Sequence, residues 1–215
     1  MSKVKLTIGM FIAVLAVGAV ASASASAAGW MMEGAELTGT ASLNNVAPKL
    51  LPAELTASGV TIKCKGNLEG VEPRIFGSNK GSAASLIFKE CESTTKACEL
   101  TAAEKTGIGT VPVLAEATLE GTSNVSIAFK PKTGSIFATI KYEAGSEGTC
   151  ALLGLKGVTG KVTAKSPGGK MESLEHTLEV GVTAESGELK VGSAGASLSG
   201  AAMLKLEESV NWSFL

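Results

Sequence analysis

Hydrophobic and polar residues alternate along much of the chain after residue 28, which is the pattern of strands that bury one face. The period of two recurs in five separate runs, so we expect mainly strands in this part of the sequence. The residues that share a face within each run are Val125, Ile127 and Phe129; Ile136, Ala138, Ile140 and Tyr142; Leu178, Val180, Val182 and Ala184; Leu189 and Val191; and Ala202, Leu204 and Leu206, followed by Val210, Trp212 and Phe214.

Two short turn sequences predict how some of these runs are connected. Pro131-Lys-Thr-Gly134 separates the first two runs, with a proline that fixes φ and a glycine free to adopt a positive φ. Ser186-Gly187 lies between the runs that end at Ala184 and begin at Leu189. Both spacings predict β-hairpins.

Weaker strand patterns occupy 58–64, 84–91, 107–119 and 158–164. Only Ala53–Ala57 and Ala97–Lys105 have a composition that favours helix, and both segments are short. Turn residues recur at a spacing typical of all-β domains. The sequence therefore predicts an all-β fold, an antiparallel β-sandwich or a β-barrel-like fold.

The first 28 residues have the three-part pattern of a secretory signal peptide. Lys3 and Lys5 are followed by the apolar run Ile8–Val20 and then by overlapping A-x-A sites in Ala21–Ala28. Such a run is too short to cross about 30 Å of hydrocarbon as a helix. We therefore expect residues 1–28 to be removed and residues 29–215 to form a single secreted domain, extracellular or associated with the cell surface, that is not an integral membrane protein.

All four cysteines, Cys64, Cys91, Cys98 and Cys150, lie after this segment. An even number of cysteines in an exported chain predicts two disulfides. We expect Cys91–Cys98 across a tight loop together with Cys64–Cys150, and the pairing Cys64–Cys91 with Cys98–Cys150 stays open. The absence of C-x2-C and the single histidine argue against a zinc site.

The charged residues exclude several classes of function. Lys and Arg number 19 and Asp and Glu 20, for a net charge of −1. Arg74 is the only arginine and there is no aspartate. The balance provides no basic surface for a nucleic-acid backbone, so we expect no nucleic-acid partner. The lack of aspartate also excludes an EF-hand and an aspartic protease.

No set of residues predicts catalysis. Ser93-Thr-Thr-Lys96, Lys132-Thr-Gly134 and Ser209-Val-Asn211 resemble the motifs of penicillin-binding enzymes, but their order and spacing along the chain are wrong for those enzymes. His176 lies in a polar segment, so we interpret it as a solvated surface residue, and Trp30 as part of a frayed N-terminus. We therefore expect no enzyme activity, no catalytic, cofactor-binding or metal-binding residues and no cofactor.

A ten-residue sequence motif occurs near both ends of the predicted domain. Residues 34–43 and 195–204 both match G-A-x-L-[ST]-G-x-A-x-L. Because such a match favours equivalent positions in one sheet, we predict that the two strands that carry these segments, the first and last after residue 28, are neighbours.

Several short motifs resemble a class of uncharacterised exported proteins from actinobacteria. They are Ile62-Lys-Cys64, Phe88-Lys-Glu-Cys91 and a further cysteine shortly after, here Cys98. The resemblance implies a secreted, β-rich protein and no known activity. The chain departs from the class at Lys89-Glu90, where relatives tend to carry a small residue.

Three functional hypotheses follow. The first is a non-enzymatic extracellular β-protein with a structural, surface-association or binding role toward an unknown extracellular or envelope partner. The second is a carrier with an apolar cavity inside a barrel, and the third is a hydrolase that uses two glutamates across an open cleft. The size of the interior side chains distinguishes the first two hypotheses, because small inward residues either let two sheets approach closely or leave a void. The small residues expected to point inward are Ala138, Gly181, Ala184, Gly200 and Ala202.

Overall fold

The computed structural model describes residues 29–46, 52–66 and 68–214. Almost all of the regular structure is antiparallel strand, so the predicted all-β fold is confirmed. The predicted signal peptide falls on residues 1–28, outside the described residues. No helix among the residues described is both long and apolar enough to span a membrane.

Eight strands close into an antiparallel barrel, which settles the choice between sandwich and barrel. The ring closes where the last long strand pairs with the first, Leu206 opposite Leu43. The predicted neighbourhood of these two strands is thereby confirmed. In order around the ring the strands are β20 (Ala194–Leu206), β18 (Glu175–Val182), β17 (Val162–Ser166), β14 (Asn124–Pro131), β13 (Val113–Glu120), β8 (Lys80–Ala83), β7 (Arg74–Phe76) and β3 (Thr40–Val46).

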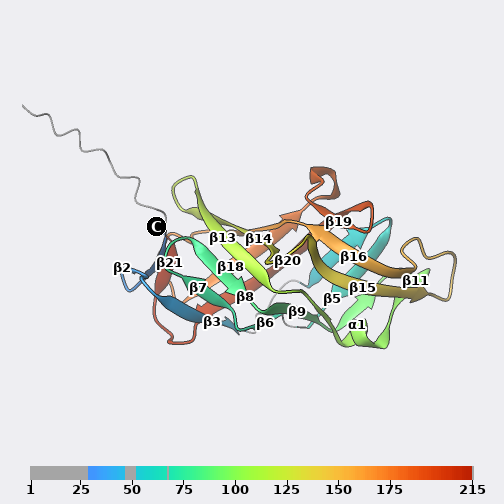
Figure 1. The fold of residues 1–215 in the computed structure, drawn as a ribbon, viewed down its shortest axis with the longest axis horizontal. Helices are drawn as coiled ribbons and strands as arrows, with labels where there is room; N and C mark the ends of the chain where they lie inside the picture. The colour runs from blue at the N-terminus through green and yellow to red at the C-terminus, as the bar shows by residue number, and fades with distance from the viewer. Residues whose placement is uncertain (1–28, 47–51, 67, 215) are drawn as a thin grey trace, which may run out of the picture.

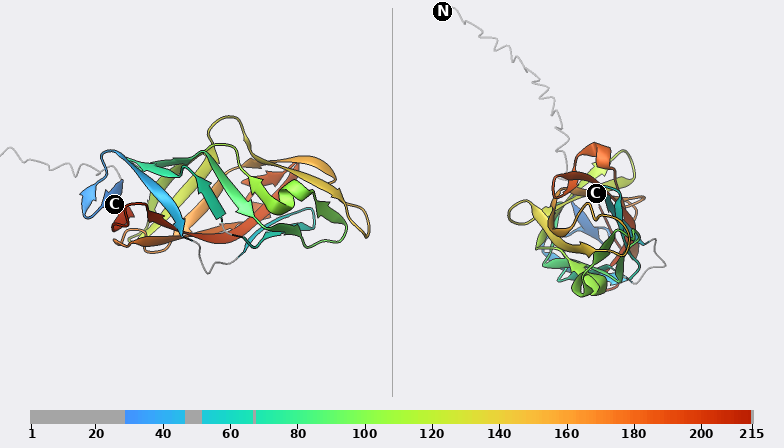
Figure 2. Two further views of the ribbon diagram at one scale, coloured as in Figure 1. Left: turned by 90° about the horizontal axis from the view of Figure 1, so that it is seen from below. Right: turned by 90° about the vertical axis from the view of Figure 1, so that its right-hand side faces the viewer.

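The N-terminal half of β20 continues past the barrel and belongs to a second sheet. Figure 1 shows this second sheet on the right of the elongated molecule and the barrel on the left. Viewed along the long axis, strands surround the middle of the molecule (Figure 2). The second sheet consists, in order, of β10 (Cys91–Ser93), β5 (Val60–Cys64), β4 (Ala53–Ala57), β20, β19 (Leu189–Val191), β16 (Gly154–Gly160), β15 (Ile136–Ala144) and β11 (Cys98–Leu100).

Two three-stranded sheets and two short helices complete the described structure. One small sheet, β6 (Leu68–Val71), β9 (Ser85–Lys89) and β12 (Gly107–Gly109), lies along the middle of the molecule. The other, β2 (Ala35–Glu36), β1 (Trp30–Met32) and β21 (Trp212–Phe214), lies at the free end of the barrel. The helices are α1 (Ala102–Thr106) and the 3-10 turn η1 (Ala184–Ser186).

The prediction that Trp30 frays is wrong. Trp30 is only 4% exposed, because β1 pairs with β21 and places its ring against Trp212 and Phe214. Its indole Nε1 also donates a hydrogen bond to the Lys80 carbonyl at 2.8 Å. These rings join the apolar side chains that fill this end of the barrel.

Neither predicted hairpin forms. Strand β14 pairs with β13 and β17, whereas β15 pairs with β11 and β16, so the turn at Pro131–Gly134 carries the chain from the barrel to the second sheet. Similarly, β18 and β19 both pair with β20, and η1 lies between them. Of the helix-friendly segments, Ala53–Ala57 is a strand and Ala97–Lys105 contains part of α1.

Two disulfides connect the second sheet, in the pairing that the sequence left open. Cys64–Cys91 joins β5 to β10, where the two residues lie directly opposite each other. Cys98–Cys150 joins β11 to the loop that precedes β16. The expected pairing of Cys91–Cys98 with Cys64–Cys150 is therefore wrong.

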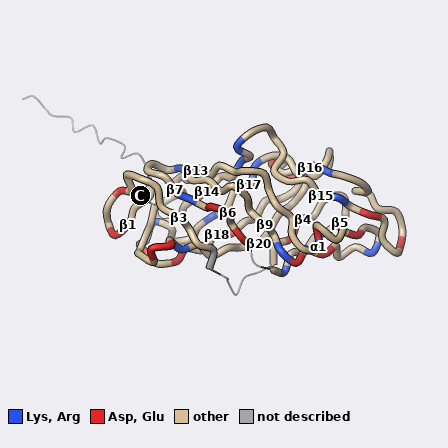
Figure 3. Tube along the Cα trace, turned by 60° about the horizontal axis from the view of Figure 1, so that its bottom comes forward, with Lys and Arg blue, Asp and Glu red and all other residues tan. Residues whose placement is uncertain are grey.

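Charged side chains are spread over both halves of the molecule, with the two signs interspersed (Figure 3). Many of the lysines form ion pairs with glutamates, including Lys63 with Glu54 on the adjacent strand and Lys161, just after β16, with Glu188, just before β19. This mixed distribution of charged residues agrees with the near-zero net charge of the sequence.

Candidate functional site: an apolar cavity

A cavity of about 160 Å³, partly open to solvent, lies where the barrel meets the second sheet. Strands of both contribute to its wall, since β14, β17 and β18 come from the barrel and β4, β5, β15 and β16 from the second sheet. Strand β20 belongs to both and passes along the cavity at Leu198–Ala202. The cavity therefore lies at the junction of the two parts of the fold.

Small inward residues leave this space unfilled. Ala138 on β15, Ala164 on β17 and Ala202 on β20 occupy positions where neighbouring inward residues are Leu, Ile or Val. Larger residues that face the same space, including Leu55 and Phe129, remain only half-buried. A tightly packed core would bury side chains of this size completely.

Gly200 allows β20 to pass between the two parts. Its φ is +150°, a conformation that residues with a side chain rarely adopt. A Cβ at this position would lie 3.1 Å from the Ala53 Cα, so a side chain would also meet the backbone of β4. The glycine therefore positions β4 beside β20 at the wall of the cavity.

The small sheet of β6, β9 and β12 forms one side of the cavity with a row of apolar side chains. In the register of this sheet, Phe88 lies between Leu68 and Ile108. All three line the cavity, as does Leu86 two residues before Phe88. Because residues two apart share a face of a strand, β9 presents Leu86 and Phe88 to the cavity and Lys89 to the outside.

Thr110 attaches this sheet to β15. Its backbone N–H donates to the Leu86 carbonyl at 2.9 Å and its hydroxyl accepts from the Leu86 N–H at 2.9 Å. Its backbone also forms an isolated antiparallel bridge with Ala138. Thr110 and Ser199 provide the only side-chain hydroxyls in the wall, and no charged residue among those described lines the cavity.

The structure corrects two of the five inward positions expected from the sequence. Ala138, Gly200 and Ala202 line the cavity. Gly181 is instead exposed on β18, and Ala184 belongs to η1. The three small residues that do face inward line an apolar cavity and are not packed in a filled two-sheet core.

His176 is buried, so its interpretation as a solvated surface residue is wrong. It is 6% exposed, its ring packs edge-on against Trp212 with centroids 4.4 Å apart, and its Nε2 lies 2.7 Å from the Trp212 carbonyl oxygen. Since a carbonyl oxygen only accepts, Nε2 is the protonated nitrogen. Desolvation by burial lowers the pKa of His176 below its usual value of 6.5, and the hydrogen bond to Trp212 opposes this effect.

The alternation of apolar residues in β18 predicts that His176 is buried. His176 lies two residues before Leu178, and residues two apart share a face of a strand, so it continues the inward row of Leu178, Val180 and Val182. The polar residues around it in the sequence obscured this pattern.

The motifs that resemble penicillin-binding enzymes are dispersed. Ser93 lies in β10 and its hydroxyl donates to the Thr95 carbonyl, while Lys96 pairs with Glu147 at 2.8 Å. Asn211 directly precedes β21. This strand lies at the opposite end of the molecule from β11, which begins two residues after Lys96 (Figure 1). The described structure therefore does not bring these motifs into one site.

A second hollow, of about 430 Å³, is polar and lies beside Arg74. Glu69, Glu72 and Glu207 line it, and Arg74 pairs with Glu72 at 3.3 Å. Within the described ranges no group of three or more His, Cys, Asp or Glu residues is arranged to hold a metal ion. The apolar cavity is therefore the stronger candidate for a functional site.

Comparison with known proteins returned no significant match to a protein-family model, a curated protein or a solved structure.

Proposed function

We propose that the protein is a non-enzymatic, secreted binding protein that carries a small apolar ligand in the cavity between its barrel and its second sheet. The two disulfides support an oxidising compartment. The cavity itself is the observation that carries the proposal.

The apolar side chains left half-buried around the cavity support a role in binding. Leu55 and Phe129 remain partly exposed in its wall. A bound apolar group would remove more of this surface from water, at about 25 cal/mol per Å². A ligand that fills the space would restore the missing van der Waals contacts.

Water is a poor occupant of this space. A buried water needs two to four polar partners, and apolar cavities of similar size stay dry and accept apolar molecules. Aliphatic and aromatic side chains form most of the described wall, whose hydroxyls belong to Thr110 and Ser199. The chemistry of the wall therefore favours an apolar ligand.

Binding of 1-octanol by the wild-type protein tests the proposal, measured by calorimetric titration and by the thermal unfolding midpoint. We expect saturable binding and a midpoint that rises with ligand concentration, because the ligand stabilises the folded state that binds it. Absence of both effects would contradict the carrier role.

Two variants in the cavity wall and one outside it connect the binding to the cavity. Ala202→Leu places a larger side chain in the cavity, whereas Ala128→Leu places the same side chain on the outer face of β14, away from it. We expect Ala202→Leu to weaken octanol binding at least about tenfold and to be more stable by about 0.5–2 kcal/mol. Ala128→Leu should bind as the wild type does, and Ala138→Val provides a smaller obstruction from β15.

A surface-association role is the second candidate, supported by exposed apolar residues near the start of β15 and β16. Leu153, Leu155 and Ile136 are 55%, 68% and 45% exposed. Ile136 lies over Gly157, on the outer face that also carries Leu155. A chain that binds no octanol would leave this role as the better account.

A further inference from the structure

We infer that the cavity selects uncharged ligands, meaning alcohols, esters or hydrocarbons of about six to ten carbon atoms, and rejects the carboxylate of the same chain length. This inference rests on the proposed carrier function and specifies the chemical class of its ligand.

The wall of the cavity offers no partner for a charge. The row Leu68, Phe88 and Ile108 covers one side, and the rest of the described wall contains no Lys, Arg, His or Glu. Moving an ionised carboxylate from water into such surroundings is strongly unfavourable unless a cation or several donors pair with it. A neutral ester or alcohol carries no such penalty.

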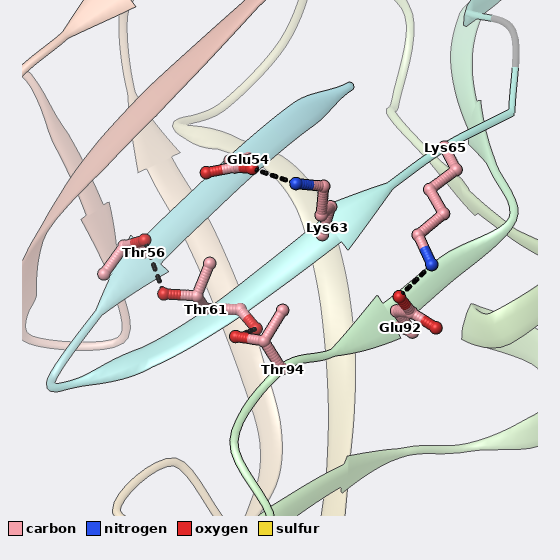
Figure 4. Close-up of polar contacts among 7 residues, drawn as sticks. All are labelled: Glu54, Thr56, Thr61, Lys63, Lys65, Glu92 and Thr94. Carbon is pink, nitrogen blue, oxygen red and sulfur yellow. Dashed lines mark hydrogen bonds and ion pairs between the residues drawn. The ribbon is translucent and has the colours of Figure 1, made fainter. Parts of the chain in front are cut away.

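Several lysines next to wall residues in the sequence pair with glutamates outside the cavity. Lys63 lies between the wall residues Ile62 and Cys64, yet its Nζ is 2.7 Å from Glu54 on the outer face of β4. Lys65 pairs with Glu92 in the same way, and both pairs appear in Figure 4. Lys89, directly after Phe88, pairs with Glu69.

Thr110 provides hydrogen-bonding capacity suited to a neutral oxygen. Its hydroxyl oxygen already accepts from the Leu86 N–H, and its hydroxyl hydrogen has no acceptor within the described part of the chain. One hydroxyl hydrogen can satisfy a carbonyl or alcohol oxygen of a ligand. Even together with the Ser199 hydroxyl, it does not replace the several donors or the cation that a carboxylate needs.

The volume of the cavity limits the size of the ligand. An apolar cavity of about 150 Å³ in another protein binds benzene, and the present cavity is about 160 Å³. Ligands of about six to ten carbons therefore fit, whereas a long-chain lipid would have to leave part of its chain outside.

Titration of the wild-type protein with 1-octanol, methyl octanoate and octanoate at about pH 8 tests the inference, since octanoate is ionised there. We expect the alcohol and the ester to bind and octanoate to bind at least about tenfold more weakly. Octanoate binding that equals or exceeds that of the ester would overturn the inference and leave the carrier role intact. Failure of all three ligands to bind would overturn the carrier role itself.

A substitution that adds a positive charge to the cavity wall also tests the inference, because it should change which ligand binds. Ala202→Lys introduces an ammonium group into the cavity wall, and Ala128→Lys introduces it on the outer face of β14. We expect the first variant to gain octanoate binding and the second to keep wild-type selectivity. A folded Ala202→Lys protein that still prefers the ester would argue against charge as the basis of selection. If this variant does not fold, the wild-type comparison of the three ligands still decides the question.

Discussion

Small side chains at a few inward positions determine what the interior of this protein can do. Ala138, Ala164 and Ala202 face the cavity from three different strands, and each leaves space that a Leu or Phe would occupy. The alternation of the sequence correctly places Ala138 and Ala202 inward. Whether small inward residues bring sheets together or leave a void depends on sheet spacing, which no single residue encodes.

His176 shows how local composition can obscure the pattern of a strand. Its neighbours Glu175 and Thr177 are polar, but it shares an inward face with Leu178. The ring is held by Trp212 through both an aromatic contact and a hydrogen bond. A buried neutral imidazole of this kind makes stability depend on pH.

We predict that acidification weakens the fold through His176. Because its pKa is lower in the folded than in the unfolded protein, the unfolded chain takes up the proton more readily. The contribution of His176 to the free energy of unfolding should not change with pH above about pH 6.5. It should fall as the pH is lowered from there toward the pKa of His176 in the folded protein. Thermal unfolding midpoints between about pH 8 and 5 would measure this loss.

His176→Gln serves as the control, since it keeps an N–H donor for the Trp212 carbonyl and does not titrate. The variant should lose the part of the decline that lies above the range where glutamates titrate, about pH 4–5. Equal pH dependence of the variant and the wild type would contradict the assignment to His176.

Individual strands were easier to predict than their partners. The inward face Val125, Ile127 and Phe129 of β14 is confirmed by its packing in the barrel. On β15 a bulge between Ile136 and Ala138 turns Ile136 outward, which strict alternation could not anticipate. Alternation reports which side of a strand is apolar, and contains no information about the strand beside it.

The two hairpin predictions are wrong for the same reason: the sequence pattern of a strand does not identify its partner. Pro131–Gly134 is a suitable turn sequence, but the strands on either side of it belong to different parts of the fold. Likewise, Cys91 and Cys98 are close in sequence, yet β10 pairs with β5 and β11 pairs with β15. Strand pairing, rather than loop length, determines which cysteines meet.

Tryptic digestion without reduction tests the disulfide pairing, because lysines separate all four cysteines. We expect peptide 64–65 attached to 90–96, and peptide 97–105 attached to 142–156. A peptide 90–96 joined to 97–105 would contradict the structure.

Replacing each cysteine pair by serine should lower the free energy of unfolding by about 3–4 kcal/mol, because the bridges close segments of 27 and 52 residues in the unfolded chain. Denaturant unfolding of the two double variants measures this loss. A negligible change in both would argue that the bridges do not form.

At the scale of the whole molecule, one strand joins the two parts of the fold. Strand β20 closes the barrel through β3 and continues into the second sheet through β4 and β19. The cavity lies along this strand, where residues from both parts converge. The repeated sequence motif predicted that β3 and β20 are neighbours. The participation of β20 in both the barrel and the second sheet depends instead on contacts between residues far apart in the chain.

The central claim is that this junction contains an unfilled apolar space able to accept a ligand. A crystal structure of the wild-type protein under xenon pressure tests it most directly, because xenon enters dry apolar cavities and is located by its scattering. We predict a xenon site inside the cavity, in contact with side chains such as Ile62, Phe88 and Ile140. Side chains packed together with no xenon between them, or ordered water in that place, would contradict the account.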